Sequence, residues 1–333
     1  MKLYHLLAFA LSVAAALSCC FAALGQEKPQ GPEPPIRVTV ERVNVGVIVT
    51  DGSGNFVDGL RREDFQILDN GMEQPITDFL SVMEPARVLL LIESGPAVVF
   101  LGKEHIRAAE KLLNGLAADD RVAVAGYSKE PDLLLDFTAD KATARYALEN
   151  LNFMLGFARL NLSSSLASAI DWLGTLGEKT TIVVLSTGID TTPQGKWQAI
   201  EQKLETSDVR VMAVSLSGDF RKPIKHRVLS REEKENRAYV KQGFAAGDRD
   251  LSELSRLTGG RVYFPKSQKD FDRAYAEIAQ VIRHEYSIAF RPAVQDGQIH
   301  SIMVKVQGFD RRIDHRQAYL APVSAPAPPA PTK

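Results

Sequence analysis

The sequence contains almost no cysteine and no excess of either charge. Its 333 residues include two cysteines, Cys19 and Cys20, and 40 basic residues stand against 41 acidic ones. Because the two charges nearly balance, the chain has no net positive charge that would attract nucleic acid. Beyond residue 25, no apolar run approaches the roughly 18 residues that a membrane-spanning helix needs. These absences exclude a disulfide framework, a strongly basic nucleic-acid surface, and a transmembrane helix beyond residue 25.

Motifs for the common catalytic machineries are also missing. The chain has no Gly-x-Ser-x-Gly elbow, no His-Glu-x-x-His pair and no Gly-x-x-x-x-Gly-Lys-Ser/Thr phosphate loop. Its six histidines are scattered, and none has a second histidine at metal-ligand spacing. The serine run at 163–165 is expected near Asp190 and Glu93, but no general base accompanies it. A hydrolase is therefore a remote alternative, and we expect a protein that is not an enzyme.

The first 25 residues differ from the rest of the chain. Lys2 precedes an apolar run over 6–17, and small residues end at Gly25 before polar sequence begins. This pattern is typical of a cleaved secretory signal, so we expect an exported protein, either secreted or periplasmic. The residues up to Cys20 also resemble a bacterial lipoprotein signal. In that alternative, Cys20 carries a lipid anchor and the protein is associated with the outer membrane.

Two stretches with strand patterns flank the middle of the chain. Residues 36–85 begin with valines at nearly every second position and predict a small β unit. Residues 284–321 contain three further predicted strands, which either pack with this unit as one accessory β domain or form a separate element. Proline-rich sequence lies outside both stretches, so we predict a disordered linker over 26–35 and a disordered tail over 322–333.

The turn Asp51-Gly52-Ser53-Gly54-Asn55 offers three side-chain oxygens, which raises the question of a calcium-binding loop. Such a loop needs an acidic residue at its twelfth position, where this chain has Arg62, and a helix after it. Neither condition is met. We therefore predict a polar β-turn without a metal ion.

The middle of the chain is organised around a strand predicted at 87–94, which reads Arg-Val-Leu-Leu-Leu-Ile-Glu-Ser. Its five consecutive large apolar residues indicate a strand buried on both faces. Later segments repeat an apolar strand followed by a turn and an amphipathic helix. The repeat predicts an α/β fold over 86–283, with a doubly wound, mostly parallel, Rossmann-like sheet flanked by helices. Because ligands of such sheets bind beyond the carboxyl ends of the strands, Glu93 and Ser94 are candidate site residues.

A basic stretch interrupts this repeat. Residues 218–247 contain nine Lys, Arg and His side chains and only scattered apolar residues. Their composition predicts a charged, solvated surface insertion, although an acidic partner or anionic lipid is an alternative use for it. The next predicted helix covers only 251–258 and ends at Gly259-Gly260.

The order of the predicted elements, including a hairpin edge strand at 133–137, resembles the von Willebrand factor A (VWA) domain. The flanking motifs are similar to those of the secreted bacterial VWFA-related family, and the resemblance spans residues 36–322. These motifs lie at 45–54, 59–65, 284–287 and 317–322.

The resemblance implies a place for a metal-ion-dependent adhesion site. Domains of this family bind a divalent cation through Asp-x-Ser-x-Ser after the first central strand, a Thr before a Leu-rich helix, and an Asp after the next central strand. In this chain all five ligand positions are altered. They carry Glu93, Gly95 and Ala97 in the first part, Leu160 or Asn161 in the second, and Thr187 in the third.

The resemblance therefore implies a degenerate site with no tightly bound metal and no other cofactor, because Mg²⁺ requires near-octahedral oxygen ligation. The oxygens that remain on this vestigial rim belong to Glu93, Ser94, Asn161, Thr187 and Asp190. One alternative retains weak Mg²⁺ or Ca²⁺ binding through Glu93, Ser94 and Asp190, completed by a carboxylate of the partner. A structural interpretation makes Glu93 an exposed acid at a strand end and Asp190 a turn or cap residue.

The altered site and the VWA resemblance together imply an adhesion or protein-binding module. Apolar residues stand on the rim in place of metal ligands. They favour a contact with a partner protein that excludes more water than a metal-binding rim would. The sequence does not identify that partner. The partner-binding candidates are Glu93, Ser94, Pro96, Ala97, Leu160, Asn161, Thr187 and Asp190.

Overall fold

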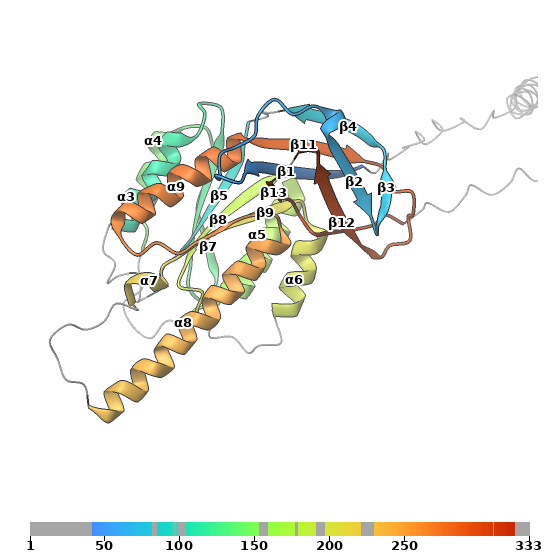
Figure 1. Ribbon diagram of the computed structural model, residues 1–333. Helices are drawn as coiled ribbons and strands as arrows, with labels where there is room; N and C mark the ends of the chain where they lie inside the picture. The colour runs from blue at the N-terminus through green and yellow to red at the C-terminus, as the bar shows by residue number, and fades with distance from the viewer. Residues whose placement is uncertain are drawn as a thin grey trace, which may run out of the picture. The chain divides into compact units, whose positions relative to one another are not determined.

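The structure is a computed structural model, which describes residues 42–81, 85–95, 98, 104–152, 159–176, 179–190, 197–220, 230–308 and 310–323 (Figure 1). These residues belong to one compact unit, Glu41–Lys333. The predicted signal and linker, most of the predicted tail, and the candidate residues Cys20, Pro96 and Ala97 lie outside the described residues. None of the helices among the described residues combines the length and the apolar character that a membrane span requires.

A six-stranded sheet forms the centre of this unit. Its strand order is β10-β9-β8-β5-β6-β7, and neighbouring strands are parallel except for β6 and β7. The antiparallel edge strand β7 contains the predicted strand at 133–137, and the predicted mostly parallel, doubly wound sheet is confirmed. The strands are β5 (Arg87–Glu93), β6 (Arg121–Tyr127), β7 (Pro131–Thr138), β8 (Thr180–Ser186), β9 (Val209–Ser215) and β10 (Val262–Tyr263).

Helices cover both faces of this sheet (Figure 1). In β5, Val88, Leu90 and Ile92 pack against one set of helices, whereas Leu89 and Leu91 pack against the other. Two-sided burial therefore explains the unbroken apolar run in this strand. The first set is α3 (Glu104–Gly115), α4 (Lys141–Glu149) and α9 (Gln268–Arg283), and the second is α5 (Leu162–Leu176), α6 (Trp197–Thr206) and α8 (Arg231–Leu257). The short helix α7 (Ser217–Phe220) follows β9.

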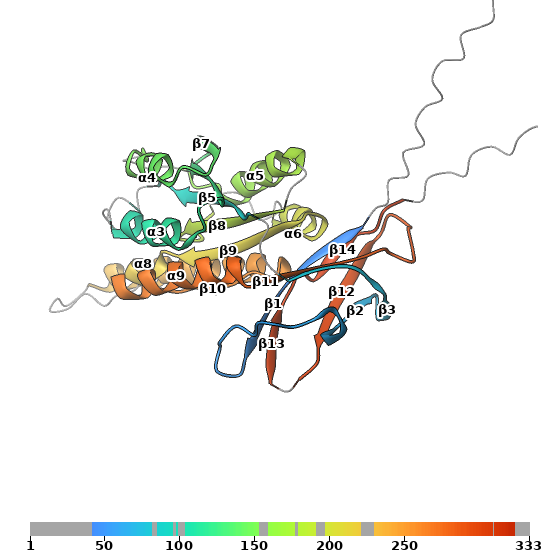
Figure 2. The ribbon, with the colours of Figure 1, turned by 90° about the horizontal axis from the view of Figure 1, so that it is seen from above.

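The two flanks of the chain form a second, antiparallel part of the fold. One sheet has the order β13-β1-β11-β4 and the other the order β14-β12-β2-β3. Figure 2 shows β1 beside β13 and β2 beside β12, although each pair joins opposite ends of the sequence. Of the two arrangements considered for the flanks, packing together as one accessory β domain is the one that the structure shows. Its elements are β1 (Val43–Asp51), η2 (Arg62–Asp64), β2 (Phe65–Asp69), β3 (Met72–Gln74), β4 (Ile76–Ser81), β11 (Glu285–Phe290), β12 (Ile299–Val306), β13 (Arg311–Asp314) and β14 (Ala318–Leu320).

β1 joins the two parts because both of its faces are used. Val43, Val45, Val47 and Val49 lie in the core of the accessory β domain, which explains the alternating valines. Ile48 points the other way and is buried in the core beneath the central sheet. The two parts of the fold therefore share a packed boundary along this strand.

α8 is much longer than predicted. The helix predicted over 251–258 begins instead at Arg231, inside the stretch expected to be a surface insertion. A capping box starts it: Ser230 Oγ accepts a hydrogen bond from the Glu233 N–H (3.1 Å), and the Glu233 carboxylate accepts one from the Ser230 N–H (2.8 Å). Apolar periodicity does not reveal this half of the helix because the first apolar side chain that it buries is Phe244.

Candidate functional site

The described rim residues lie at one edge of the central sheet. Glu93 is the last residue of β5 and Ser94 follows it, while Thr187 follows β8. Leu160 and Asn161 immediately precede α5. Because β5 and β8 are parallel neighbours, their carboxyl ends meet, and the loops that follow them come together.

Glu93 lies inside the protein, with 0% of its surface exposed. Its Oε2 atom accepts hydrogen bonds from the Thr187 N–H (2.7 Å), the Thr187 hydroxyl (2.8 Å) and the Ser186 hydroxyl (3.1 Å). The other carboxylate oxygen, Oε1, is buried and has no hydrogen-bond partner within the described residues. The interpretation of Glu93 as an exposed acid is therefore wrong, because the polar groups at the end of β8 enclose the carboxylate.

Tyr127, the last residue of β6, completes this buried polar network. Its hydroxyl donates a hydrogen bond to Ser186 Oγ (2.6 Å) and lies 3.4 Å from Glu93 Oε2. Burial raises the pKa of Glu93, although the hydrogen bonds from Thr187 oppose this shift. Burial, followed by the charge of Glu93, raises the pKa of Tyr127. A carboxyl group that resists ionisation is a poor ligand for a divalent cation.

Leu160 fills the space beside Gly95. A Cβ atom on Gly95 would lie 2.5 Å from Leu160 Cδ2, well inside the normal separation of two carbon atoms. Leu160 is 6% exposed, so its side chain is packed on its other sides as well. Position 95 is one where the metal-binding motif carries a serine. Here position 95 is a glycine, which has no side chain, and the apolar side chain of Leu160 packs against it.

Asn161 and Asp190 hold the start of α5. Asn161 Oδ1 accepts a hydrogen bond from the Ser164 N–H (3.1 Å), which is the arrangement of a helix N-cap. Asp190 Oδ2 accepts one from the Ser163 N–H (2.8 Å). Both side chains are partly exposed. Asp190, which the structural interpretation made a turn or cap residue, thus contacts the first turn of α5 from the loop after β8.

The groups at this edge fit a divalent cation poorly. Gly95 and Leu160 supply no side-chain oxygen, and Glu93 Oε2 already accepts three hydrogen bonds. Ser94 donates its hydroxyl proton to the carbonyl oxygen of Tyr127 (2.9 Å). Among the residues that the structure describes, no three His, Asp or Glu side chains are grouped so as to hold a metal ion.

The second place considered for a metal, the turn after β1, is a hydrogen-bonded turn. Asp51 Oδ1 accepts hydrogen bonds from the Ser53 N–H (2.9 Å) and the Asn55 N–H (2.8 Å). The hydrogen bonds from Asn55 lower the pKa of Asp51. The carboxylate is thus committed to the turn, and the predicted polar β-turn is confirmed.

Serines at the start of α5 lack the geometry of an activated nucleophile within the described chain. Ser163 and Ser165 are buried, and Ser165 Oγ has no hydrogen-bond partner among the described residues. The described histidines accept or donate elsewhere: His284 contacts Gln280, His300 contacts Asp69 and Asp296, and His315 contacts Arg316. A general base for these serines is not found in the described part of the molecule.

The loop after β8 touches α8 through two glycines. A Cβ atom on Gly188 would lie 2.5 Å from the carbonyl carbon of Gly247, and a Cβ atom on Gly247 would lie as close to that of Gly188. Gly188 also has a φ of +72°, a conformation that other residues rarely adopt. The backbone of α8 therefore meets the loop that carries Thr187.

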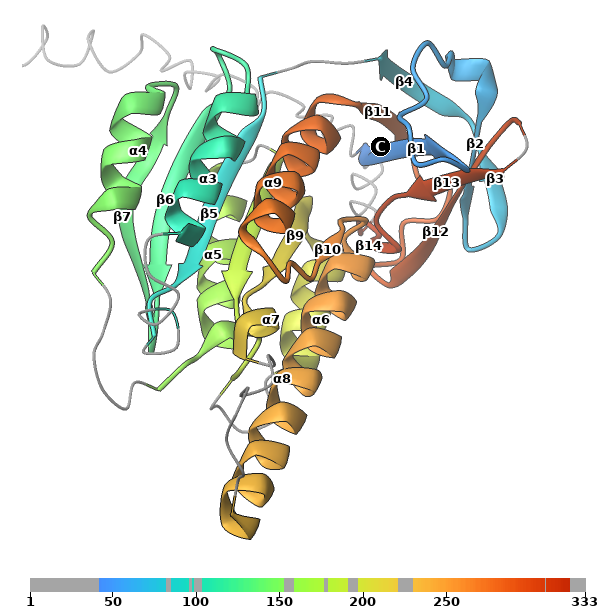
Figure 3. The same cartoon turned by 60° about the vertical axis from the view of Figure 1, so that its left-hand side comes forward.

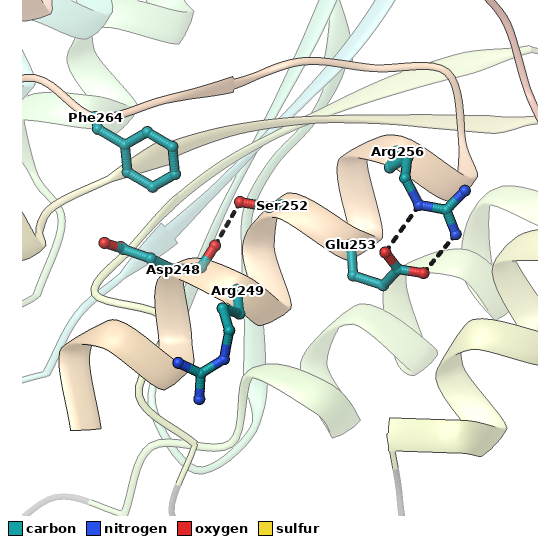
Figure 4. A pocket seen from close by; sticks show the side chains of 6 residues that line it. All are labelled: Asp248, Arg249, Ser252, Glu253, Arg256 and Phe264. Carbon is teal, nitrogen blue, oxygen red and sulfur yellow. Dashed lines mark hydrogen bonds and ion pairs between the residues drawn. The ribbon is translucent and has the colours of Figure 1, made fainter. Parts of the chain in front are cut away.

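A hollow of about 510 Å³ lies along the carboxyl-terminal half of α8 (Figure 4). Arg256 is held there by Glu253 through two contacts (2.9 and 2.6 Å), and Asp248 accepts hydrogen bonds from two buried serine hydroxyls. Two other groups that line the hollow are exposed: the ring of Phe264 and the guanidinium of Arg249. The hollow is lined by Asp248, Arg249, Ser252, Glu253, Arg256 and Phe264.

Sequence reasoning found Glu93, Leu160 and Thr187 but missed Tyr127 and Ser186. Both missed residues end apolar strands of the same parallel sheet, at the edge where Glu93 lies. A search for polar residues at every predicted strand end would have found them. The hollow along α8 had no such signal, because the length of that helix was not predicted.

No family model matches the chain, and no curated protein matches it. Several solved structures resemble it in fold. An aerotolerance-related membrane protein from Bacteroides fragilis is 17% identical, with a TM-score of 0.43 over 59% of this chain and 98% of that chain. BatB from Bacteroides thetaiotaomicron is 13% identical, with a TM-score of 0.40 over the same shares of the two chains, 59% and 98%.

A von Willebrand factor type A protein from Catenulispora acidiphila is 10% identical, with a TM-score of 0.43 over 86% of this chain and 75% of that chain. A proximal thread matrix protein from the mussel byssus, solved with a zinc-occupied metal-ion-dependent adhesion site, is 10% identical, with a TM-score of 0.43 over 60% and 48%. The order of this chain's own strands and the helices on both faces of its sheet make it a VWA-like domain joined to an accessory β domain.

Proposed function

We propose that this protein is an exported, non-catalytic interaction module whose VWA-like domain contacts a partner protein without a bridging metal ion. The observation that carries the proposal is the packing of Leu160 against Gly95, where a Cβ atom would meet Leu160 Cδ2 at 2.5 Å. An apolar side chain occupies space that a metal-binding rim leaves for side-chain oxygens and water. The edge is closed by packing rather than held open for an ion.

Burial of the remaining carboxylate supports the same conclusion. Glu93 has 0% of its surface exposed, and its Oε2 atom is surrounded by donors from Ser186 and Thr187. These donors take the place that a cation would occupy beside a carboxylate. In this proposal, Glu93 serves to hold the loop after β8 in position.

The partner contact would fall on the exposed parts of this edge. Glu93, Ser94, Leu160 and Thr187 are buried, so they position the loops and do not touch a partner in this conformation. Arg159 is exposed beside Leu160, and Asn161 and Asp190 are partly exposed. Export rests on the signal-like residues 1–25, with lipidation at Cys20 as the variant that would tether the protein to the outer membrane.

A pull-down from the exported fraction of the producing cells tests the proposal. We expect the wild-type protein to recover the same partner with and without EDTA, and Arg159→Glu to weaken the recovery. Tyr146→Glu, at a 68% exposed position on α4, is the matched control and should leave recovery unchanged. Loss of the partner in EDTA, or equal recovery by Arg159→Glu and the wild type, would contradict the proposal.

The second candidate function keeps a weakly bound Mg²⁺ or Ca²⁺ at Glu93, Ser94 and Asp190. One observation favours it: Glu93 Oε1 is buried and has no hydrogen-bond partner among the described residues. Calorimetric titration with Mg²⁺, Mn²⁺ and Ca²⁺ separates the two candidates. Heat that is absent from the Glu93→Gln variant would support the ion, whereas no heat at millimolar ion would remove it.

A further inference from the structure

His300 lies between two carboxylates inside the accessory β domain. It is on β12 and is 3% exposed. Its Nδ1 atom lies 2.8 Å from Asp69 Oδ1, and its Nε2 atom lies 3.1 Å from Asp296 Oδ1. An ionised carboxylate accepts hydrogen bonds and donates none, so both contacts are hydrogen bonds only when both ring nitrogens carry a proton. The arrangement therefore fits the positively charged form of His300.

The groups that face His300 come from three parts of this domain. β2 and β14 both pair with β12 (Figure 3), and they carry Asp69 and Tyr319, which are each 1% exposed. The Tyr319 hydroxyl donates a hydrogen bond to Asp69 Oδ2 (2.9 Å) and lies 3.2 Å from His300 Nδ1. Burial, followed by the hydrogen bond to Asp69, raises the pKa of Tyr319, whereas the charge of Arg316 lowers it. Tyr319 therefore keeps its proton near neutral pH and remains a donor to Asp69.

Asp296, in the turn before β12, is the third of these groups. The hydrogen bond from the Gln298 N–H (2.9 Å) is the main cause of its lowered pKa, so its carboxylate is ionised near neutral pH. When His300 loses one proton, one of its nitrogens faces a carboxylate without a donor. Asp69 is buried, whereas the Asp296 side chain is 43% exposed and can turn to water. The remaining proton is therefore expected on Nδ1, and the contact between Nε2 and Asp296 is the one that is lost.

The turn that contains Asp296 also holds the last described residues of the chain. Asp296 and Val323 form an antiparallel bridge, and the Gly297 N–H donates a hydrogen bond to the Pro322 carbonyl oxygen (3.3 Å). A Cβ atom on Gly297 would lie 2.9 Å from Val323 Cγ2, so Val323 lies directly against the turn. We refer to the contact between residues 296–297 and 322–323 as the terminal contact. Movement of Asp296 away from His300 would therefore disturb the position of the chain end.

We infer that His300 is a pH-sensitive switch, which holds the terminal contact in place when the ring is protonated and loosens it when the ring is neutral. Only the protonated ring ties Asp296 to the interior of the domain through Nε2. Histidine side chains change charge between about pH 5 and 8, so the terminal contact should be firm in acid and should loosen as the pH rises. The switch lies in the accessory β domain, so the inference does not depend on the partner contact proposed for the central sheet.

Nuclear magnetic resonance of the protein labelled with ¹³C-valine and ¹⁵N-histidine tests the inference. We expect the nuclear Overhauser effect between the Val323 methyl groups and Gly297 to weaken at least about twofold from about pH 5 to about pH 9, because the terminal contact loosens. The ring-nitrogen shifts of His300 should change over the same pH range. The methyl shifts of Val304, which is buried on β12, should stay constant and show that the domain remains folded.

Two variants change the switch in different ways. Asp296→Asn offers an amide N–H to the unprotonated Nε2 atom, so the Overhauser effect should persist at about pH 9. His300→Gln removes the titrating ring, so the effect should no longer change with pH. His284→Gln is the matched control, because His284 Nε2 also faces a carboxylate, at 3.8 Å from Asp58 Oδ2, and the pH profile of this variant should equal that of wild type.

Three results would overturn the inference. They are an Overhauser effect that stays constant over this pH range in wild type, a transition that remains in His300→Gln, and a Val304 shift that moves in step with the transition. If His300→Gln does not fold, Asp296→Asn decides, because its side chain is partly exposed. A wild-type pH profile in that variant would also overturn the switch. None of these results bears on the proposed function, which the pull-down measures separately.

Discussion

Two glutamates at opposite edges of the central sheet show how differently one fold can accommodate a carboxylate. Glu93, at the carboxyl end of β5, is surrounded by neutral donors, and burial raises its pKa. Glu285, at the start of β11, is also largely buried, and burial alone would raise its pKa as well. Arg210 and Lys179 overcome that effect, so the pKa of Glu285 is lowered.

Two cations contact the carboxylate of Glu285, which explains why its pKa is lowered despite its burial. Its Oε2 atom lies 2.9 Å from Arg210 Nη1, and its Oε1 atom is ion-paired with Lys179. Arg210 also donates a hydrogen bond to the carbonyl oxygen of Gly46 (2.9 Å), which ties β9 to β1. A Cβ atom on Gly46 would collide with the carboxylate of Glu285, so glycine makes room for the cluster.

The two edges of the central sheet are closed in different ways. Charge pairs hold the accessory β domain to the edge where the central strands begin, whereas apolar packing and neutral hydrogen bonds close the edge where they end. At the second edge, burial raises the pKa of Glu93, so its carboxylate is held by neutral donors and not by cations.

Glu285→Gln should produce the largest loss of stability. It leaves Arg210, whose side chain is 4% exposed, as a buried cation without its carboxylate. Breaking a buried pair in this way costs about 3 kcal/mol or more. Urea unfolding measures the change. Asp171→Asn, which removes the partner of Lys203 in an exposed pair, is the control and should cost under about 1 kcal/mol. Equal costs for the two variants would mean that the boundary does not depend on Glu285.

Gly95→Ala should destabilise the protein by about 1–3 kcal/mol, because the new Cβ atom overlaps Leu160. Leu160→Ala removes the overlapping atoms, so the effect of Gly95→Ala should nearly disappear in that background. A double-mutant cycle in urea measures this coupling. Additive effects of the two substitutions would show that Leu160 does not fill the space beside Gly95.

Glu93→Gln and Glu285→Gln should change the pH dependence of stability in opposite directions. The folded-state pKa of Glu93 is raised, so its contribution is present at low pH and is lost as the pH rises through that pKa. The pKa of Glu285 is lowered, so its contribution is present above its unfolded-state value and is lost in acid.

Unfolding free energies measured from about pH 2 to 8 test this difference, because the Glu285 contribution changes in acid and the Glu93 contribution changes at higher pH. Relative to wild type, Glu93→Gln should gain stability as the pH rises, whereas Glu285→Gln should lose it. Parallel profiles for the two variants would contradict the assignment of opposite shifts.

Asn161→Ala should have the smallest effect, about 1 kcal/mol, because it removes one N-cap hydrogen bond to the Ser164 N–H. Asn161→Asp keeps the acceptor and should retain most of the stability. Thermal unfolding of the two variants gives the comparison. If alanine and aspartate behave alike, Asn161 does not act as the cap of α5.

Much of the fold could be predicted from the sequence because burial leaves a local pattern. Two-sided burial in β5 appears as a run of five apolar residues, and one-sided burial in β1 appears as alternating valines. Residues 231–243 of α8 were not predicted as helix for the opposite reason. None of their described side chains is buried, so this stretch has no apolar periodicity that would indicate a helix.

The candidate site was predicted only in part. That Gly95 and Leu160 have no side-chain oxygen is visible in the sequence, and no fold can supply one. The burial of Glu93 is not visible, because its donors come from Ser186 and Thr187, more than ninety positions away along the chain. Long-range pairing of this kind depends on which strands become neighbours in the sheet.

The sequence by itself determined the class of the protein: alternating strands and helices, two β flanks, and residues without side-chain oxygens at positions 95 and 160. Those features follow from which residues are apolar and which carry oxygen. Only the tertiary structure decided the environments of Glu93 and Glu285. The ionisation of a buried carboxylate depends on the groups within a few ångströms of it, and the fold brings those groups together from distant parts of the chain.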